Sequence, residues 1–157
     1  MASKNENLTL FAYGTNISQT EMKSHSENAM FIGYGELENF SLKFRGFQGH
    51  AIATLEKQKG AKVPIAIYDL TQADRFTIDN FEKFPYAYIR KKVKTTINGK
   101  KLKGNIYILK IKLEPNLPNE EYIKALRLAY FEAGFDDAPI DEAIKECGGT
   151  VNEEELY

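Results

Sequence analysis

The stretch Leu8-Thr9-Leu10-Phe11-Ala12-Tyr13-Gly14-Thr15-Asn16 decides how the fold begins. Its first six residues are short, apolar and aromatic, which predicts a buried strand, and Gly14 ends it. Ser18-Gln19-Thr20-Glu21 fits a capping box, so a short helix is expected to start at Ser18. A glycine that permits an unusual backbone angle, placed between a strand and a helix, gathers free backbone N–H groups into an anion site. Taken alone, such a turn is more often a simple reversal of the chain than a binding site.

Four further strands and a second helix are expected in the next sixty residues. Apolar runs separated by glycine and polar residues predict strands at residues 29–34, 40–47, 50–55 and 63–70. Thr71-Gln72-Ala73-Asp74 resembles a second helix start, with Asp in place of the usual Glu or Gln. This helix is expected to run to about Phe81, and Pro85 prevents it from continuing past Phe84. Its predicted buried stripe is Leu70, Phe76 (or Ala73), Ile78 and Phe81.

The clearest hairpin follows this helix. Residues 88–97 alternate in polarity, Asn98-Gly99 is a type I′ turn signal, and residues 102–113 return. A helix is predicted from about Glu120 to Ala133, with Gly134 as its C′ residue. A shorter helix at residues 140–147 stops at Gly148-Gly149.

This order of elements predicts an α+β fold. Few links between strands are long enough for regular βαβ crossovers, so a Rossmann-type sheet is disfavoured. No internal repeat or linker divides the chain, and we expect one domain over residues 1–157, with a core at about 8–147 and flexible termini.

Composition narrows the class of protein. Hydrophobic residues make up 43% and charged residues 27% of the 157 residues, as in ordinary globular proteins. No stretch reaches the roughly 20 apolar residues that span a bilayer, and the first residues lack the apolar run of a signal peptide, so a cytoplasmic protein without membrane contact is expected. The single Cys147 excludes internal disulfides, and His25 and His50 share no metal-ligand spacing with it, so neither metal nor cofactor is predicted.

The net charge of −1 is unevenly distributed. Residues 83–113 contain ten basic residues and no acidic one, whereas residues 114–157 contain twelve acidic and three basic residues. Such asymmetry can mark a nucleic-acid patch, two segments that face each other, or two solvated faces. Because no nucleic-acid motif accompanies the lysines, we do not expect nucleic acid as a partner.

Glu82 is the strongest candidate for acid–base chemistry. It follows the predicted second helix, where the negative end of the macrodipole disfavours an anion. Its neighbours Phe81, Phe84, Tyr86 and Tyr88 are largely apolar, and desolvation also raises a carboxylate pKa. Lys83 would oppose this shift if its ammonium lay close. For an arbitrary glutamate, a solvated surface position is the commoner explanation.

Two segments together resemble the γ-glutamylcyclotransferase family, including its bacterial members and the plant AIG2-like proteins. Leu10-Phe11-Ala12-Tyr13-Gly14-Thr15-Asn16 is similar to the family's apolar strand running into Tyr-Gly-Ser-Asn. The family's second block, roughly Leu-Asp-x-x-Glu-Gly-x-Pro-x-x-Tyr-x-Arg, is matched at residues 78–90 by Ile-Asp-Asn-Phe-Glu-Lys-Phe-Pro-Tyr-Ala-Tyr-Ile-Arg. The likeness spans about residues 8 to 135. Thr15 replaces the usual Ser, and Lys83 replaces a Gly whose backbone angles a Lys adopts only at a cost.

The resemblance implies a mixed sheet curling into a small barrel with flanking helices. It also implies an enzyme that needs no metal and cyclises the γ-glutamyl group of a γ-glutamyl amide to 5-oxoproline, releasing an amine or amino acid. Glu82 would be the acid–base catalyst, and the substrate would be bound by Tyr13, Gly14, Thr15, Asn16 and Tyr88. Arg90 could pair with a carboxylate, but we expect it to be a surface residue of the basic hairpin.

Two other functions stay open at this stage. A family member with impaired catalysis could bind a small acidic ligand, with Lys83 having spoiled the proton shuttle. An interaction protein could use the basic hairpin at residues 90–103 against an acidic partner, which predicts binding with a steep salt dependence. The leaving amine and the choice between monomer and homodimer are not encoded in these motifs.

Overall fold

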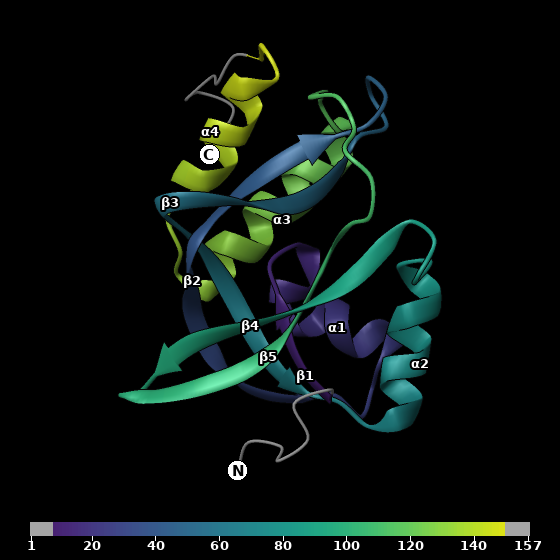
Figure 1. The fold of residues 1–157 in the computed structure, drawn as a ribbon, viewed down its shortest axis with the longest axis vertical. Coiled ribbons are helices and arrows are strands. Elements are labelled where there is room, and N and C mark those ends of the chain that lie inside the picture. The colour runs from purple at the N-terminus through teal and green to yellow at the C-terminus, as the bar shows by residue number, and fades with distance from the viewer. Residues whose placement is uncertain (1–7, 150–157) are drawn as a thin grey trace.

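Five strands form one mixed sheet in the computed structural model, which describes residues 8–149 (Figure 1). The strands are β1 (Thr9–Ala12), β2 (Met30–Arg45), β3 (Ile52–Asp69), β4 (Tyr88–Ile97) and β5 (Lys100–Leu109). Their order in the sheet is β2-β3-β1-β5-β4. Neighbouring strands are antiparallel except β1 and β5, which pair in parallel. The predicted α+β class with a mixed sheet is confirmed, and the termini expected to be flexible lie outside the described residues.

Four α-helices and one 3₁₀ turn, η2 (Thr15–Ile17), accompany the sheet. The helices are α1 (Gln19–His25), α2 (Gln72–Phe81), α3 (Glu120–Ala133) and α4 (Ala138–Glu146). α3 packs against η2 and α4 against β2, whereas α1 and α2 lie together near β1 (Figure 1). None of the helices within residues 8–149 is long and apolar enough to cross a membrane.

The sheet curls until its two edge strands approach each other. The Thr95 hydroxyl on β4 donates a hydrogen bond of 2.8 Å to the Glu36 carbonyl on β2. A Cβ atom on Gly33 of β2 would lie only 3.1 Å from the Ile97 side chain on β4. Within the described part of the chain no backbone ladder joins these two strands, so the sheet is a curled, unclosed relative of a barrel.

Two long strands replace the four shorter ones predicted between residues 29 and 70. β2 continues through a register shift between Glu38 and Phe40, where Asn39 adopts a φ of 66°. The Asn39 side chain accepts a 3.0 Å hydrogen bond from the N–H of Gly60 on β3. The polar and glycine positions that suggested loops are therefore accommodated by a β-bulge in a continuous hairpin.

The predicted helix caps and the hairpin turn are confirmed. Ser18 and Thr71 accept from the backbone N–H groups of Glu21 and Asp74, and Thr71 forms a full capping box. Gly134 ends α3 with a left-handed φ of 82°. Asn98 and Gly99 both have positive φ between the paired residues at the ends of β4 and β5, but β5 ends at Leu109 rather than at residue 113.

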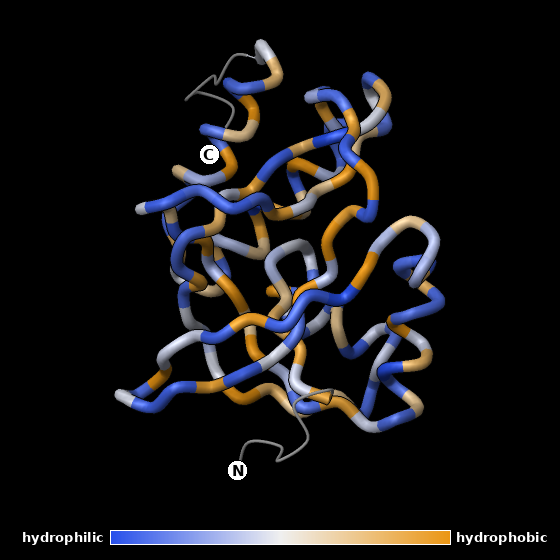
Figure 2. Tube along the Cα trace, in the orientation of Figure 1, coloured by the Kyte–Doolittle hydropathy of each residue, from blue (hydrophilic) through white to orange (hydrophobic). Residues whose placement is uncertain are grey.

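The core lies between the strands and the helices, where apolar segments converge in Figure 2. Phe11 of β1 packs so closely on β5 that a Cβ on Gly104 would lie 2.7 Å from its ring. The predicted apolar stripe of α2 is half right, because Leu70 and Ile78 are buried but Phe76 and Phe81 are 68% and 67% exposed. Asp74 and Ile78, one helical turn apart, form the inward side instead.

Candidate active site

A pocket of about 390 Å³ opens where β1 ends and the chain turns into η2. The structure brings all six sequence-predicted site residues to its wall: Tyr13, Gly14, Thr15, Asn16, Glu82 and Tyr88. They come from the β1–η2 turn, the end of α2 and the start of β4. Residues that are distant in the chain therefore share one cavity.

The β1–η2 turn forms one wall of the pocket. Gly14 is the N-cap of η2, and its carbonyl accepts a 3.0 Å hydrogen bond from the N–H of Ile17. The N–H groups at the start of the turn precede this first bond, so they have no acceptor inside it. Gly14 does not use the positive φ open to glycine, since its φ is −104°. Its missing side chain leaves room instead, because a Cβ would lie 3.4 Å from the Tyr122 hydroxyl.

Glu82 occupies the C-cap of α2 and lines the same pocket as this wall. Its N–H donates 2.8 Å to the carbonyl of Ile78, which fixes the backbone from which the side chain projects. The residue is half-buried, and burial raises its pKa to about 7. A carboxyl group with this pKa exchanges a proton readily near neutral pH.

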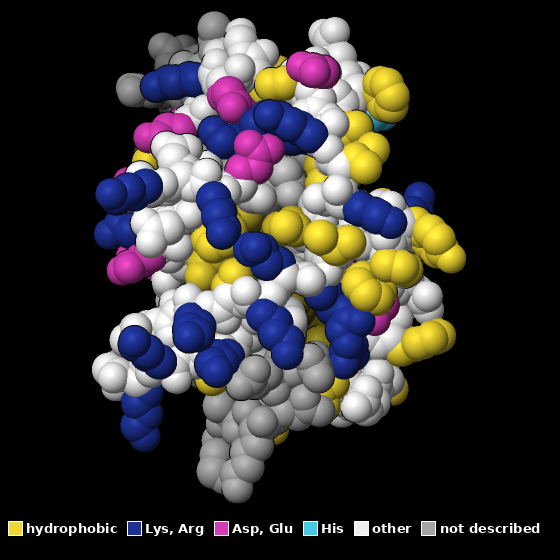
Figure 3. All heavy atoms as spheres, in the orientation of Figure 1, with side chains coloured by type: hydrophobic (Ala, Val, Ile, Leu, Met, Phe, Trp, Pro, Cys, Tyr) yellow, Lys and Arg dark blue, Asp and Glu magenta, His cyan; other side chains and the backbone are white. Residues whose placement is uncertain are grey.

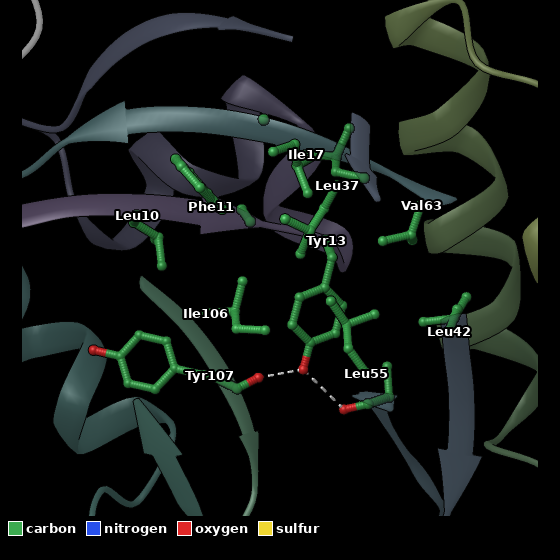
Figure 4. Close-up of a cluster of buried hydrophobic side chains, with 14 of the residues drawn as sticks. Leu10, Phe11, Tyr13, Ile17, Leu37, Leu42, Leu55, Val63, Ile106 and Tyr107 are labelled. Carbon is green, nitrogen blue, oxygen red and sulfur yellow. Dashed lines mark hydrogen bonds between the residues drawn. The ribbon is translucent and has the colours of Figure 1, made fainter. Parts of the chain in front are cut away.

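Four tyrosines surround the carboxylate: Tyr13, Tyr88, Tyr107 and Tyr122. Burial raises the pKa of each, and the nearby charge of Glu82 raises it further. The hydroxyl of Tyr88 donates 2.7 Å to the carbonyl of Ala53. The hydroxyl of Tyr13 lies between the carbonyls of Tyr107 and Ala53, as Figure 4 shows. These phenols therefore stay protonated, and those of Tyr13 and Tyr88 direct their hydrogens toward backbone carbonyls.

His25 connects the turn to the end of α2. Its Nε2 lies 2.9 Å from Oδ1 of Asn16, and its Nδ1 lies 2.9 Å from the hydroxyl of Ser26. The imidazole stacks on the ring of Phe81, with centroids 5.5 Å apart and planes at 16°. Burial lowers the His25 pKa, which favours the neutral ring. Because an amide oxygen can only accept, Nε2 carries the hydrogen and Nδ1 accepts from Ser26.

Arg90 fixes the segment that carries Glu82 and is not a simple surface residue. Its side chain is 19% exposed, with the guanidinium carbon 4.1 Å from the centre of the Phe84 ring. Its Nε lies 3.4 Å from the carboxylate of Asp79, which also accepts from the hydroxyl of Tyr107. The N–H of Phe84 in turn donates 2.8 Å to the carbonyl of Asp79. This cluster ties the residues on both sides of Glu82 to β4 and β5.

The wall also contains residues that the sequence did not single out for the site, among them His25, Tyr107 and Tyr122. Tyr107 lies on β5 and Tyr122 on α3, and both reach the pocket through tertiary packing that leaves no local pattern. The available signal for His25 was its position in the last turn of the helix that starts at Ser18. Among residues 8–149, no group of three or more His, Cys, Asp or Glu side chains is arranged to hold a metal ion.

Comparison with known proteins identifies a family and a fold. Residues 10–124 match the family model described as gamma-glutamyl cyclotransferase, AIG2-like. No curated protein sequence matches the chain. A solved structure named gamma-glutamyl cyclotransferase superposes with a TM-score of 0.74 at 22% identity, covering 95% of both chains. An uncharacterized protein from Homo sapiens gives 0.74 at 23% identity, covering 97% of this chain and 96% of its own. An AIG2-like protein from Mus musculus gives 0.53 at 24% identity, covering 68% of this chain and 79% of its own.

Proposed function

The chain belongs to the gamma-glutamyl cyclotransferase, AIG2-like family, and we propose that it cyclises the γ-glutamyl group of a γ-glutamyl amide. In this reaction the substrate's own α-amine attacks its side-chain carbonyl. A new C–N bond closes the five-membered ring of 5-oxoproline, the original amide C–N bond breaks, and an amine or amino acid leaves. The observation that carries the proposal is that Glu82, whose pKa is about 7, lines the same pocket as the β1–η2 turn.

Glu82 moves the proton in this mechanism. The α-ammonium has a reference pKa of about 8 and must lose a proton before its nitrogen can attack. The ionised Glu82 accepts that proton, and the resulting carboxylic acid donates it to the departing amine. The second proton, which the attacking nitrogen loses on becoming the lactam N–H, ends on the released amine, which leaves as an ammonium ion. A carboxyl group whose pKa lies near the working pH serves well in both directions.

The β1–η2 turn stabilises negative charge in the same mechanism. The N–H groups between Gly14 and Asn16 would bind either the oxyanion that develops on the attacked carbonyl or the α-carboxylate of the substrate. Tyr13 and Tyr88 line the part of the pocket that would hold the glutamyl group of the substrate. If the pocket holds the substrate in its folded conformation, the α-amine of the substrate serves as the nucleophile and no external one is needed. Well-oriented intramolecular reactions of this kind reach effective molarities of about 10⁵ M or more.

The geometry at Lys83 favours an active enzyme over a family member that only binds an acidic ligand. Lys83 replaces the glycine expected after the glutamate, yet it adopts the left-handed φ of 53° that glycine adopts easily. Its carbonyl accepts from the N–H groups of Tyr86 and Ala87 at 2.8 and 2.9 Å. The loop thus follows a path suited to glycine, and Glu82 keeps its place in the pocket wall.

The proposal is tested by incubating the protein with a panel of γ-glutamyl amino acids and γ-glutamylamines and measuring 5-oxoproline. We expect turnover of at least one panel member and its loss in Glu82→Gln. Glu27→Gln, an exposed glutamate outside the pocket, is the matched control and should retain full activity. Absence of 5-oxoproline across a broad panel, or full activity of Glu82→Gln, would show the mechanism to be wrong.

A further inference from the structure

A second groove, of about 370 Å³, lies where β3 and the chain after β5 diverge. Residues 54–57 of β3 form one wall, and residues 108–113 form the other. The two walls are joined by a hydrogen bond of 3.0 Å from the N–H of Leu109 to the hydroxyl of Thr54. This groove shares no lining residue with the Glu82 pocket.

The backbone of β3 has an unpaired edge along this groove. Residues 52–57 pair with β2 on one side only, and β1 pairs with β3 farther along, at residues 66–69. Beyond Thr54, no strand in the described part of the chain covers the other side. An open strand edge of this kind can accept an additional extended strand from another polypeptide.

The charges around the groove are almost all positive. Four lysines line it: Lys57, Lys91, Lys110 and Lys112. None of their ammonium groups has an ion-pair partner among the described residues. The single acidic wall residue, Glu56, is already paired with Arg45 at 3.0 Å. Figure 3 shows lysine and arginine side chains around an apolar hollow on this face.

The remaining wall of the groove is apolar and mainly aliphatic: Leu55, Ile108, Leu109, Ile111 and Leu113. Ile111 is 63% exposed, so part of this wall faces solvent. Phe40, the one aromatic residue among the described residues that line the groove, is only 8% exposed. Nucleic-acid bases bind by stacking on accessible aromatic rings, which this groove does not provide.

We propose that this groove binds an extended acidic segment of a partner polypeptide. The segment adds a strand to the open edge of β3, and its alternating apolar side chains cover the aliphatic wall. Its carboxylates pair with the four lysines at the rim, and the lysines of the neighbouring β4–β5 hairpin attract it from a distance. This function goes beyond catalysis in the Glu82 pocket and does not depend on it.

The proposal is tested with a fluorescein-labelled peptide of sequence Glu-Val-Glu-Leu-Glu-Val-Glu and fluorescence anisotropy on the full chain. We expect saturable binding that weakens with added salt. Replacing the three apolar residues by Ser, or the four Glu by Gln, should weaken binding about tenfold or more, which corresponds to about 1.4 kcal/mol. Backbone amide shifts in an NMR titration should change at residues 55–57 and 109–113.

Charge reversal gives a matched pair of variants. Lys57→Glu with Lys110→Glu should weaken peptide binding about tenfold or more, because like charges then face the peptide. Lys23→Glu with Lys124→Glu changes the net charge equally on residues outside the groove, and should alter binding less than about twofold. Any of three results would overturn the proposal. They are equal effects of the two pairs of variants, absence of peptide binding, and stronger binding of a twelve-residue oligothymidylate than of the peptide.

Discussion

The raised pKa of Glu82 suits acid–base catalysis but lowers the stability of the folded protein when the side chain is ionised. Burial opposes its charge and raises its pKa from 4.5 to about 7. The carboxylate is therefore less stable in the folded chain than in the unfolded chain, where water solvates it. The same desolvation that suits a proton shuttle makes the native state sensitive to pH.

The first prediction concerns the pH dependence of stability. The folded pKa of Glu82 exceeds the unfolded value, so its ionisation destabilises the native state as pH rises from about 4.5 to 7. At pH 8, Glu82→Gln should be more stable than the wild type by about 2 to 3 kcal/mol. At pH 4 the difference should vanish. Urea unfolding at both pH values measures it, and Glu27→Gln should show no pH-dependent gain.

The second prediction uses the same group in catalysis. Because the mechanism needs an ionised Glu82 and a protonated α-amine, log kcat/KM should rise with pH through an apparent pKa of about 7 and fall again above the α-ammonium pKa of about 8. Glu82→Asp shortens the side chain by one methylene and should lower kcat much more than it raises KM. An acid limb centred near pH 4.5 would show that the catalytic carboxyl is not desolvated as described.

The third prediction addresses Lys83. A side chain in the left-handed region costs an L-residue about 1 kcal/mol, and glycine avoids this cost. Lys83→Gly should therefore raise the free energy of unfolding by about 0.5 to 1 kcal/mol and retain turnover. Lys83→Ala removes the ammonium but keeps the Cβ, so it should not reproduce the gain. Equal stabilisation by both variants would assign the effect to charge rather than to backbone strain.

At the scale of elements, the sequence predicted the structure correctly where interactions between residues close together in the chain stabilise it. The caps at Ser18 and Thr71 and the Asn98-Gly99 turn depend on side chains and φ angles within four residues. The continuous β2–β3 hairpin depends instead on a hydrogen bond between Asn39 and Gly60. Because that hydrogen bond joins residues that are far apart in the sequence, the local sequence pattern predicted loops where β2 and β3 remain paired.

The fourth prediction concerns His25, which joins α1 to the β1–η2 turn and to α2. His25→Phe keeps the stacking on Phe81 but removes the hydrogen bond to Asn16, and should lower kcat/KM about tenfold. His25→Gln places an N–H donor near the former Nε2 and should retain most of the activity. The Asn16 side-chain amide resonances should shift in the Phe variant alone. Full activity of His25→Phe would show that orienting Asn16 is unnecessary.

At the scale of the whole molecule, Arg45 attaches the C-terminal helix to the sheet. Its side chain is 6% exposed and pairs with Glu56 on β3 and with Glu146 at the end of α4. The hydrogen bonds from Arg45 lower the pKa of Glu146. This contribution is present above the unfolded pKa of 4.5 and disappears as pH falls through the lower folded value.

The fifth prediction follows from this attachment. Arg45→Met fills similar space but removes the ion pairs with Glu56 and Glu146, of which Glu146 keeps its pair with Lys43 at 3.3 Å, and should lower the free energy of unfolding by about 2 kcal/mol at pH 7. Glu146→Gln removes the charge that pairs with both Lys43 and Arg45, and should cost about 1 kcal/mol. Both losses should shrink toward pH 3, as the pH falls through the lowered pKa of Glu146. Urea unfolding monitored by circular dichroism checks this, and a loss that is equal at both pH values would contradict the ionic explanation.

The same distinction between local and distant contacts explains which parts of the site could be predicted. The β1–η2 turn and Glu82 stand out because each lies in a short motif beside the element that positions it. Only the packing of β5, α3 and β4 around the pocket brings Tyr107 and Tyr122 to its wall and joins Arg90 to Asp79. Their chemistry is visible in the sequence, but their convergence is a property of the tertiary structure.

The position of β1 between β3 and β5 has a consequence for how the protein matures during synthesis. β1 leaves the ribosome first, yet Leu10 finds its parallel partner at Asn105. The β2–β3 and β4–β5 hairpins can each form soon after they emerge, because their strands are adjacent in the chain. A nascent chain that ends before β5 lacks one of the two strands that pair with β1, so the pairing of β1 stays incomplete. The pocket therefore forms late in synthesis, and ligand binding by a nascent chain shows that β5 has already been synthesised.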